Sequence, residues 1–468
     1  MNKSEDPTWS MSHRPPRHSS IHERSESQAI HMNIDDLPGV VLVEILCRLP
    51  CYKLVFQLKC VSKRWYALIS DPYFIGRFLY HLQTTAVEAP VTIRTLINRK
   101  GVELSWSPSC RSSNLLAPVF RKLMSFHGLK DEPVVKAIYN DLVLCCENGM
   151  DFYYICNPYT LEWVALPPSP RSYTWPHKKI PAAIICDGNY YDYTKEGTGH
   201  NTILLNADYR CKVVRILPFV DEANPYQSSK FIAEIFSSET GEWKESIIAS
   251  PVPLHLNISE VSCAYNGMLY WWDWFTNRHV GMDPFMINSN GNGDHYKLRF
   301  MEFDGEIVKS HHETINCFGV CQGGLRMCYY GEEEEDDTDD TLYVWDWREE
   351  QVCDQNGAGS SELCWKLTGV YSLGLSLDSV GDYLAIDPNN GDMLYLDVDH
   401  EICLCNIRTG DVSRLVEMGN VSVDGHFLPL VLPWWPTPVP RLPKPSWLSM
   451  LIKKLRLLAY CLVVICSE

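Results

Sequence analysis

Residues 134–166 read VVKAIYNDLVLCCENGMDFYYICNPYTLEWVAL, and this stretch decides the fold class. It contains four short runs rich in β-branched, aromatic and other apolar residues, each of strand length. Turn-forming residues separate the runs, for example Asn140-Asp141 and Asn157-Pro158. Four strands joined by tight turns predict an antiparallel four-stranded sheet.

The same four-strand rhythm returns near the other end of the chain, between Tyr383 and Val416. There YLAI, MLYLDV, EICLCN and DVSRLV are separated by the turns DPNNGD and RTG. Hairpin signals such as SSETGEW (residues 237–243) and Asn266-Gly267 lie between the two copies. Repeated four-stranded units with a period of about 45 residues are typical of a β-propeller, because each blade buries its faces only against its neighbours.

Such a period over roughly 300 residues predicts about six blades. Because the polar insert GNYYDYTKEGTGH blurs the repeat around residues 182–248, we expect five to seven. A β-sandwich is the rival all-β fold, but it would need about 100 residues per domain. It would also leave the similar turn-aromatic ends LEWVALP, GEWKESI and LCWKLTG unexplained.

Residues 34–82 have a helical texture instead. Apolar residues recur there at helical spacing in two sets. The sets are Leu42, Ile45, Leu46 and Leu49, and Val61, Trp65, Leu68 and Ile69. Pro50 and Pro72 punctuate the segment, which predicts three or four short amphipathic helices. About 50 residues form a marginal core alone, so we expect an apolar patch that a partner or a second domain covers.

The composition limits the classes of function. Lys+Arg 41 against Asp+Glu 58 give a net charge of −17, and 46% of the residues are hydrophobic, as in a globular chain. An acidic balance repels phosphate backbones, so we expect no nucleic-acid partner. The 19 cysteines show neither metal-site spacing nor a disulfide framework, and the N-terminus lacks the apolar run of a signal peptide. We therefore expect no metal and a cytoplasmic or nuclear location.

Catalytic motifs are missing from the sequence. We find no nucleophile elbow, phosphate-binding loop, metalloprotease helix or dinucleotide-binding fingerprint. We therefore expect no catalytic residues and no cofactor. Trp271, Trp272 and Trp274 in LYWWDWF offer aromatic anchors for a partner, although the period of a strand places at least one of them in the core.

Two segments differ from the rest of the chain. Residues 332–340 carry eight acidic residues, and we expect a solvated loop, with a docking site for a basic partner as the alternative. Residues 447–468 contain the apolar run Leu457–Cys466, which is shorter than the roughly 20 residues that span a bilayer. We expect this tail to pack on the propeller as an amphipathic helix, with membrane contact as the alternative.

The string LPGVVLVEILCRLPCYKLVFQLKCVSKRWYALISDPYF, residues 37–74, closely resembles the F-box. NDLVLCCENG followed by YYICNPYTLEWVALPPSP is similar to the opening blade of the kelch-like, F-box-associated β-propellers of large plant F-box families. Together these resemblances imply a non-enzymatic substrate receptor of a Skp–cullin–F-box ubiquitin ligase. The F-box would bind the Skp adaptor and, through it, cullin, while the propeller would bind a target protein for ubiquitination.

The resemblance also implies which side chains meet the adaptor. They are Leu37, Pro38, Ile45, Leu46, Leu49, Pro50, Leu54, Val61, Trp65, Leu68 and Ile69. We expect some of them to build the internal core of the helical segment as well. The resemblance names no residue that binds the target.

The expected fold class is α+β multidomain, with a small N-terminal helical F-box followed by an all-β propeller of about five to seven blades. The expected parts are a disordered arm (1–33), the F-box (34–82), a linker (83–114), the F-box-associated propeller (115–430), and a Pro-rich linker with an apolar tail (431–468). Two alternatives stay open. One is a propeller-based enzyme or lectin docked through the helical segment, and the other is a scaffold that never enters a ligase.

Overall fold

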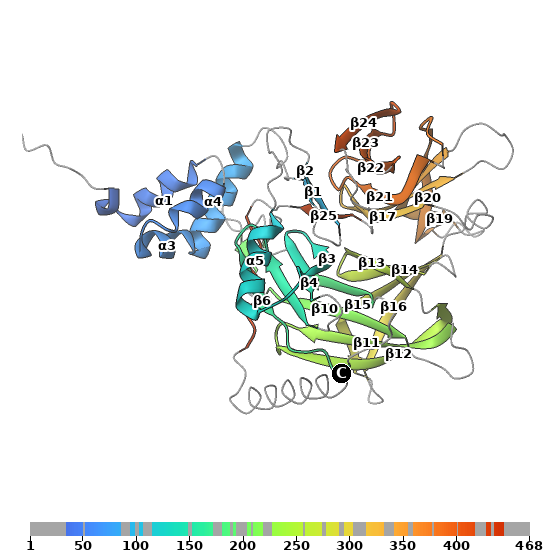
Figure 1. Ribbon diagram of the computed structural model, residues 1–468, viewed down its shortest axis with the longest axis horizontal. Coiled ribbons are helices and arrows are strands. Elements are labelled where there is room, and N and C mark those ends of the chain that lie inside the picture. The colour runs from blue at the N-terminus through green and yellow to red at the C-terminus, as the bar shows by residue number, and fades with distance from the viewer. Residues whose placement is uncertain are drawn as a thin grey trace, which may run out of the picture.

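The computed structural model of the chain places a group of helices beside a ring of β-sheets (Figure 1). It describes residues 34–49, 52–85, 94–98, 103–105, 115–147, 152–171, 180–187, 191–192, 204–206, 209–218, 227–255, 258–273, 278–289, 294–302, 315–331, 341–353, 359–376, 379–399, 401–416, 427–431 and 435–443. The expected arm at 1–33, the acidic run 332–340 and the apolar tail 447–468 lie outside the described residues.

The helical unit, residues 34–85, contains one 3₁₀ turn and four α-helices. They are η1 Ile34–Asp36, α1 Gly39–Cys47, α2 Tyr52–Leu58, α3 Lys63–Ile69 and α4 Pro72–Thr85. Ser62 begins α3, because its Oγ accepts a hydrogen bond from the backbone N–H of Trp65 at 3.2 Å. Leu42, Ile69 and Phe78 are at most 1% exposed and lie in the core between the helices. The expected short amphipathic helices are confirmed.

Five antiparallel four-stranded sheets form the blades of the propeller. Blade one is β3 Val134–Tyr139, β4 Leu142–Cys146, β5 Tyr153–Asn157 and β6 Glu162–Ala165, and blade two is β7 Ala182–Cys186, β10 Cys211–Pro218, β11 Gln227–Ser237 and β12 Glu242–His255. Blade three is β13 Ile258–Tyr265, β14 Met268–Asp273, β15 Arg278–Ser289 and β16 Asp294–Glu302, and blade four is β17 Ile315–Cys321, β18 Gly324–Gly331, β19 Thr341–Cys353 and β20 Gly359–Ser372. Blade five is β21 Val380–Ile386, β22 Met393–Val398, β23 Glu401–Asn406 and β24 Asp411–Val416. The propeller and its expected blade range are confirmed.

A three-stranded sheet closes the ring between blades five and one. It pairs β1 Arg94–Ile97 with β2 Glu103–Ser105 on one side and with β25 Leu428–Val431 on the other. The two ends of the propeller sequence therefore meet in one sheet, which lies between the red and the cyan strands of Figure 1. A further short pair, β8 Tyr191–Asp192 and β9 Leu204–Leu205, is inserted into blade two.

The apolar core of the ring is divided among the interfaces between neighbouring sheets. Trp271 of blade three, for example, packs in one cluster with Ile235 of blade two. Leu96 of the closing sheet packs with Tyr395 of blade five. A separate cluster joins the closing sheet to blade one. Each sheet is thus stabilised by its neighbours rather than by its own faces.

The expected start of the propeller, residue 115, is followed by the helix α5 Leu116–His127 and not directly by a strand. Its buried residues Leu116, Val119, Phe120 and Leu123 follow the spacing i, i+3, i+4, i+7 and pack against blade one. The expected linker at 83–114 includes the end of α4 and the strands β1 and β2. No helix in the described ranges is long and apolar enough to cross a membrane.

One turn between the third and fourth strands recurs in three blades. In each copy an N–H donates to the carbonyl oxygen four residues earlier. The pairs are Leu161 with Asn157, Gly241 with Ser237, and Gly410 with Asn406, at 2.9, 2.8 and 2.8 Å. The donor residue has a positive φ in every copy, 58° at Leu161 and 72° at Gly410, for example. Blade one therefore uses a leucine in a conformation that favours glycine.

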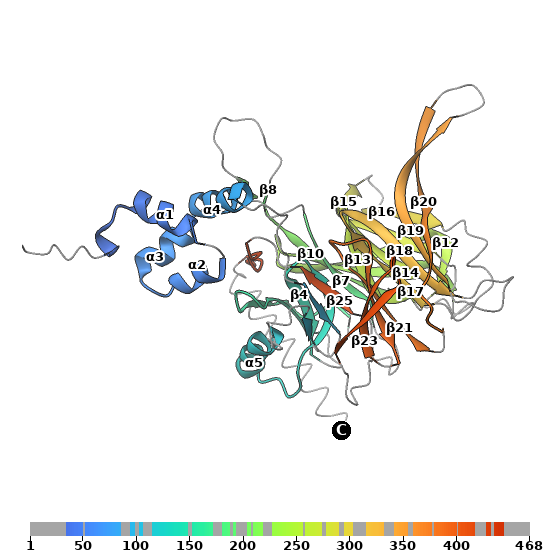
Figure 2. The ribbon, with the colours of Figure 1, turned by 90° about the horizontal axis from the view of Figure 1, so that it is seen from above.

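Blade four departs from the regular pattern at one end. β18 pairs with β19 only as far as Arg326 opposite Asp346, whereas β19 and β20 stay paired to Cys353 opposite Gly359. Figure 2 shows this two-stranded ribbon projecting beyond the other blades.

Candidate functional site

The structure separates the predicted adaptor-binding residues by their exposure. The exposed residues are Pro38, Ile45, Leu54 and Val61, and the half-buried ones are Leu37, Leu49 and Leu68. The buried residues are Leu46, Trp65 and Ile69. Pro50 lies outside the described residues. Val61 is 55% exposed, whereas Leu46 is 2% exposed in the core of the helical unit. The exposed and half-buried side chains are therefore available to a partner, and the buried three hold the helices together.

The two faces of α1 explain this division. Leu42, Val43, Leu46 and Cys47 form the buried face. Val41 and Ile45, four residues apart, lie on another face and are each 42% exposed. An apolar helix of this kind buries one stripe in its own unit and leaves a second stripe in contact with water.

Exposed apolar side chains are concentrated on the helical unit. In the described part of the chain, 14 large apolar residues are exposed, and eight of them lie between Ile34 and Tyr73. Val40 is 75% exposed, and Tyr66 and Tyr73 are each 59% exposed. These three residues and Val41 are not among those that the F-box resemblance assigns to the adaptor contact. Their signal is their position on the helix faces opposite the core residues, which requires the direction of each helix to be known.

Polar contacts fix the helices that carry these side chains. Arg64 Nη2 donates to the carbonyl oxygen of Leu37 at 2.5 Å, which holds the start of α1 beside α3. Glu44 of α1 pairs with Arg77 of α4 and, at 3.2 Å, with Arg48. The hydrogen bond from Arg77 lowers the pKa of Glu44, so this carboxylate stays ionised near neutral pH.

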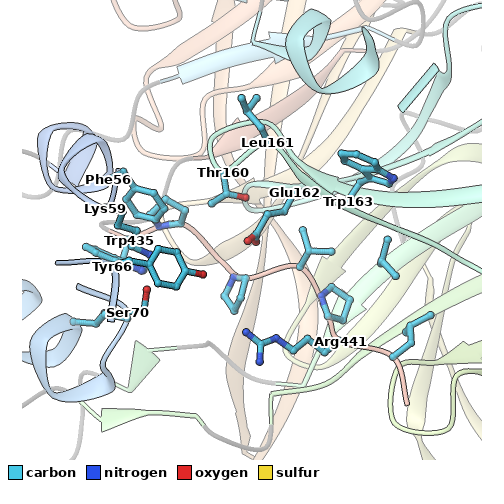
Figure 3. Close-up of a pocket in the computed structure, with 17 residues that line it drawn as sticks. Phe56, Lys59, Tyr66, Ser70, Thr160, Leu161, Glu162, Trp163, Trp435 and Arg441 are labelled. Carbon is cyan, nitrogen blue, oxygen red and sulfur yellow. The ribbon is translucent and has the colours of Figure 1, made fainter. Parts of the chain in front are cut away.

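A cleft of about 710 Å³ lies where the helical unit meets the propeller (Figure 3). Phe56, Lys59 and Tyr66 line it from the helices, and Glu162 and Trp163 line it from β6 and its edge. A third part of the wall comes from residues 435–443, which we call the strap. The strap falls in the expected Pro-rich linker, but it is packed against both units.

Lys59 is the cation on the helical side of the cleft. Its Nζ lies 4.3 Å from the centre of the Phe56 ring and 5.8 Å from that of the Trp435 ring. Burial lowers the pKa of Lys59, while the charge of Glu162 across the cleft acts in the opposite direction. Aromatic faces and one carboxylate thus surround this ammonium group.

A buried polar cluster joins the strap to blade one. Asn157 Nδ2 donates to Asp141 Oδ2 at 2.8 Å and to the carbonyl oxygen of Thr437 at 2.7 Å. The backbone N–H of Thr437 donates to the same Asp141 oxygen at 2.7 Å. Asp141 and Asn157 are fully buried, and burial raises the pKa of Asp141 to about 6. Sequence reasoning assigned these two residues only to turns, because the strap that covers them is 280 residues away in the chain.

The tryptophans singled out as possible anchors belong to the propeller core. Trp271 is fully buried and Trp272 is 8% exposed, while Trp274 lies outside the described residues. The ring of Trp272 lies 4.4 Å from that of His279, which is itself 1% exposed. Burial lowers the pKa of His279 to about 3, so its imidazole is neutral and acts as a packing group.

The cysteines of the blades are packing groups too. Burial raises the pKa of Cys211, Cys263 and Cys328 to about 12. Since the thiolate is the reactive form, these thiols are poor nucleophiles. Within the described ranges, no three His, Cys, Asp or Glu side chains come together as a metal site.

Two family comparisons match nearly the whole described chain. Residues 34–75 match the F-box domain, and residues 110–427 match the family described as F-box protein At3g26010-like, beta-propeller. The second match alone covers more than half of the chain.

Individual relatives agree with these matches. F-box protein At1g49990 of Arabidopsis thaliana is 26% identical over 246 residues, covering 49% of this chain and 54% of that protein. The Arabidopsis F-box/kelch-repeat protein At1g15680 is 26% identical, covering 51% and 53%. The chain therefore spans about half the length of these curated relatives. The crystal structure of Citrobacter koseri AztD is 11% identical and covers 63% of this chain and 61% of AztD, with a TM-score of 0.28, too low to carry an argument.

Proposed function

Because the chain belongs to the family of F-box proteins with an At3g26010-like β-propeller, we propose that it is the substrate-recognition subunit of a Skp–cullin–F-box ubiquitin ligase. In this role the F-box, the helical unit described above, binds a Skp-type adaptor and through it cullin. The propeller binds a target protein, and the chain works in the cytoplasm, the nucleus or both. Other subunits transfer ubiquitin, so the chain itself performs no chemistry.

The observation that carries this proposal is the exposed apolar surface of the F-box. Val40 and Ile45 of α1 and Val61 of the turn between α2 and α3 are exposed, although the unit has a core of its own. Apolar side chains that a small unit leaves in water are a mark of a protein interface. Ile45 and Val61 are also among the residues that the F-box resemblance assigns to the adaptor contact.

The physical contribution of such a receptor is proximity. A target held on the propeller has its lysines near the ubiquitin carrier that the adaptor and cullin bring in. This raises the effective concentration of the two reacting groups without any catalytic residue in this chain.

The test is binding of a purified Skp-type adaptor to the full chain carrying Ile45→Asp and Val61→Asp. Both positions are exposed, so the charges disrupt a partner interface while leaving the core of the F-box intact. Leu46→Asp would be uninformative, because it puts a charge into that core.

Ile247→Asp is the matched control, because Ile247 is an equally exposed aliphatic residue on β12 of the propeller, 55% exposed. We expect the double variant to lose the adaptor and Ile247→Asp to keep it, with unchanged circular dichroism for both. Retention of the adaptor by the double variant would sink the interface assignment.

A further inference from the structure

We propose that the strap, residues 435–443, sets the orientation of the F-box on the propeller, with Trp435 as the positioning residue. This inference rests on the proposed function, because orientation matters only if the F-box holds the adaptor while the propeller holds the target. The strap belongs to neither unit in sequence, since it follows the last strand of the closing sheet.

The first residue of the strap, Trp435, inserts its side chain into the core of the F-box. Trp435 is 3% exposed and belongs to the same apolar cluster as the buried residues of α1 to α4. Its ring centre lies 5.0 Å from that of Phe56, 5.6 Å from Phe78 and 6.4 Å from Phe74. The F-box therefore completes its core with a residue from the far end of the chain.

The other end of the strap is bonded to the propeller. Thr437 exchanges backbone hydrogen bonds with the buried side chains of Asp141 and Asn157 in blade one. Val439 and Leu442 pack against the apolar cluster between blades one and two. Only one residue separates Trp435 from Thr437, so the two anchors cannot move far relative to each other.

Other described contacts join the two units outside the strap. The ring of Tyr52 in α2 meets the ring of Tyr159 edge to face at 6.4 Å, and β9 lies beside α4. Elsewhere the cleft separates the helices from β6, as Figure 3 shows with Trp435 and Arg441 at opposite ends of the strap. If the strap is released, the covalent connection is through residues 86–93, and eight residues span at most about 26–29 Å.

We expect the strap to hold the F-box and the propeller at a fixed angle across the cleft. With the strap seated, the adaptor side of the F-box and the propeller keep one relative angle. With the strap released, a target on the propeller samples many positions relative to the ubiquitin carrier, and its effective concentration falls.

The test compares small-angle X-ray scattering of the full chain, free and bound to a Skp-type adaptor. The variants are Trp435→Ala, Trp435→Phe and Thr437→Pro. Thr437→Pro removes the N–H that Asp141 accepts and leaves the ring of Trp435 in place. Trp163→Ala is the matched control, because Trp163 lines the same cleft but its ring contacts Phe126 of α5 instead of the F-box.

We expect Trp435→Ala and Thr437→Pro to increase the maximum dimension and broaden the distance distribution. Trp435→Phe and Trp163→Ala should keep the wild-type curve, and adaptor affinity should stay near the wild-type value for Thr437→Pro. In a reconstituted ligase, the set of propeller lysines that become self-ubiquitinated should widen for Thr437→Pro, which mass spectrometry of peptides measures.

Wild-type scattering and an unchanged set of modified lysines for Thr437→Pro would overturn the proposal, even if Trp435→Ala unfolds the F-box. If the wild-type chain binds no adaptor, the proposed function fails, while scattering of the free chain still decides whether the strap fixes the orientation.

Discussion

Blades one and five contain the same turn and use it differently. In both, an asparagine side chain accepts hydrogen bonds from the backbone N–H groups of the second and third residues after it. Asn157 bonds Tyr159 and Thr160 in blade one, and Asn406 bonds Arg408 and Thr409 in blade five. In blade five the turn is open to water and Arg408 pairs with Asp392 at 2.6 Å. In blade one the strap covers the turn, and Asn157 also bonds Asp141 and Thr437.

The difference shows how a repeated structural element acquires a new role. The local sequence specifies the turn in both blades, because the asparagine satisfies backbone groups of its own loop. In blade one the strap covers the outer side of this turn, so the turn also forms part of the contact between the F-box and the propeller. The cost of burying Asp141 and Asn157 is offset only when every partner is present, so blade one is the more sensitive copy.

Replacing the asparagine should have the largest effect. Asn157→Ala removes both turn bonds, takes one of its two donors from Asp141 Oδ2 and leaves the Thr437 carbonyl without the donor Asn157 Nδ2, so we expect a loss of about 3–4 kcal/mol in unfolding free energy. Asn406→Ala removes two bonds that water can replace, and we expect about 1 kcal/mol. Urea unfolding followed by tryptophan fluorescence measures both. Equal losses would mean that the strap adds nothing to the blade-one turn.

The buried carboxyl of blade one should give its stability a dependence on pH. Burial raises the pKa of Asp141 from 3.8 to about 6, so between these values the folded chain binds a proton that the unfolded chain has released. This contribution to stability is complete below pH 4 and is lost as the pH rises through 6. At about 1.4 kcal/mol per pKa unit, it amounts to about 3 kcal/mol at most.

Asp141→Asn removes this titration and keeps an oxygen that accepts from Thr437. The unfolding free energy of the variant minus that of the wild type should therefore rise between pH 4 and pH 7. All other titrating groups are common to the two chains, so they cancel in the difference. A flat difference across this range would contradict the assignment to Asp141.

Substitutions at Gly410 and Leu161, the turn residues with positive φ, should change the unfolding free energy by a smaller amount. Gly410→Leu places a side chain in open space at a φ of 72°, so backbone strain alone should cost about 1–2 kcal/mol. Leu161→Gly relieves the same strain at a φ of 58° but loses packing against the cluster around α5. We expect its net change to stay within about 1 kcal/mol, measured by the same urea unfolding. A loss larger than that of Gly410→Leu would show that packing outweighs strain at Leu161.

The smallest effect should come from the exposed ion pair of blade five. Arg408 and Asp392 have side chains that are 69% and 39% exposed, so water and salt screen their attraction. We expect Arg408→Ala to leave the melting temperature unchanged in differential scanning calorimetry. A clear drop would mean that the pair helps to hold the blade-five turn.

Much of the fold could be predicted from local patterns. The strand rhythm of residues 134–166 and 383–416 indicated the blades, because strand period and turn residues are short-range signals. The helix α5 was not predicted, although the spacing of Leu116, Val119, Phe120 and Leu123 is an equally short-range signal. The closing sheet could not be predicted, since it pairs Thr95 with Leu430, and no local pattern links residues so far apart.

The candidate site could be predicted only in part. The F-box resemblance named the region but did not separate Ile45, which is exposed, from Leu46, which is buried. Neighbours in sequence differ in this way because the direction of each helix depends on the packing of the whole unit. Trp435 stands between prolines in a stretch that reads as a linker, and its role depends on a contact with α2 and α4.

The closing sheet and the strap also set the order in which the chain can become complete during synthesis. β25 and Trp435 are translated after the helices of the F-box and the five blades, so a ribosome that adds about 5–20 residues per second makes Trp435 roughly 20–70 s after Phe78. Throughout that interval the nascent F-box lacks a tryptophan of its core and the ring lacks its final strand. A product that stops before residue 428 is therefore incomplete in both units at once, because the rings of Phe56, Phe74 and Phe78 lose their contact with Trp435 and the closing sheet loses β25.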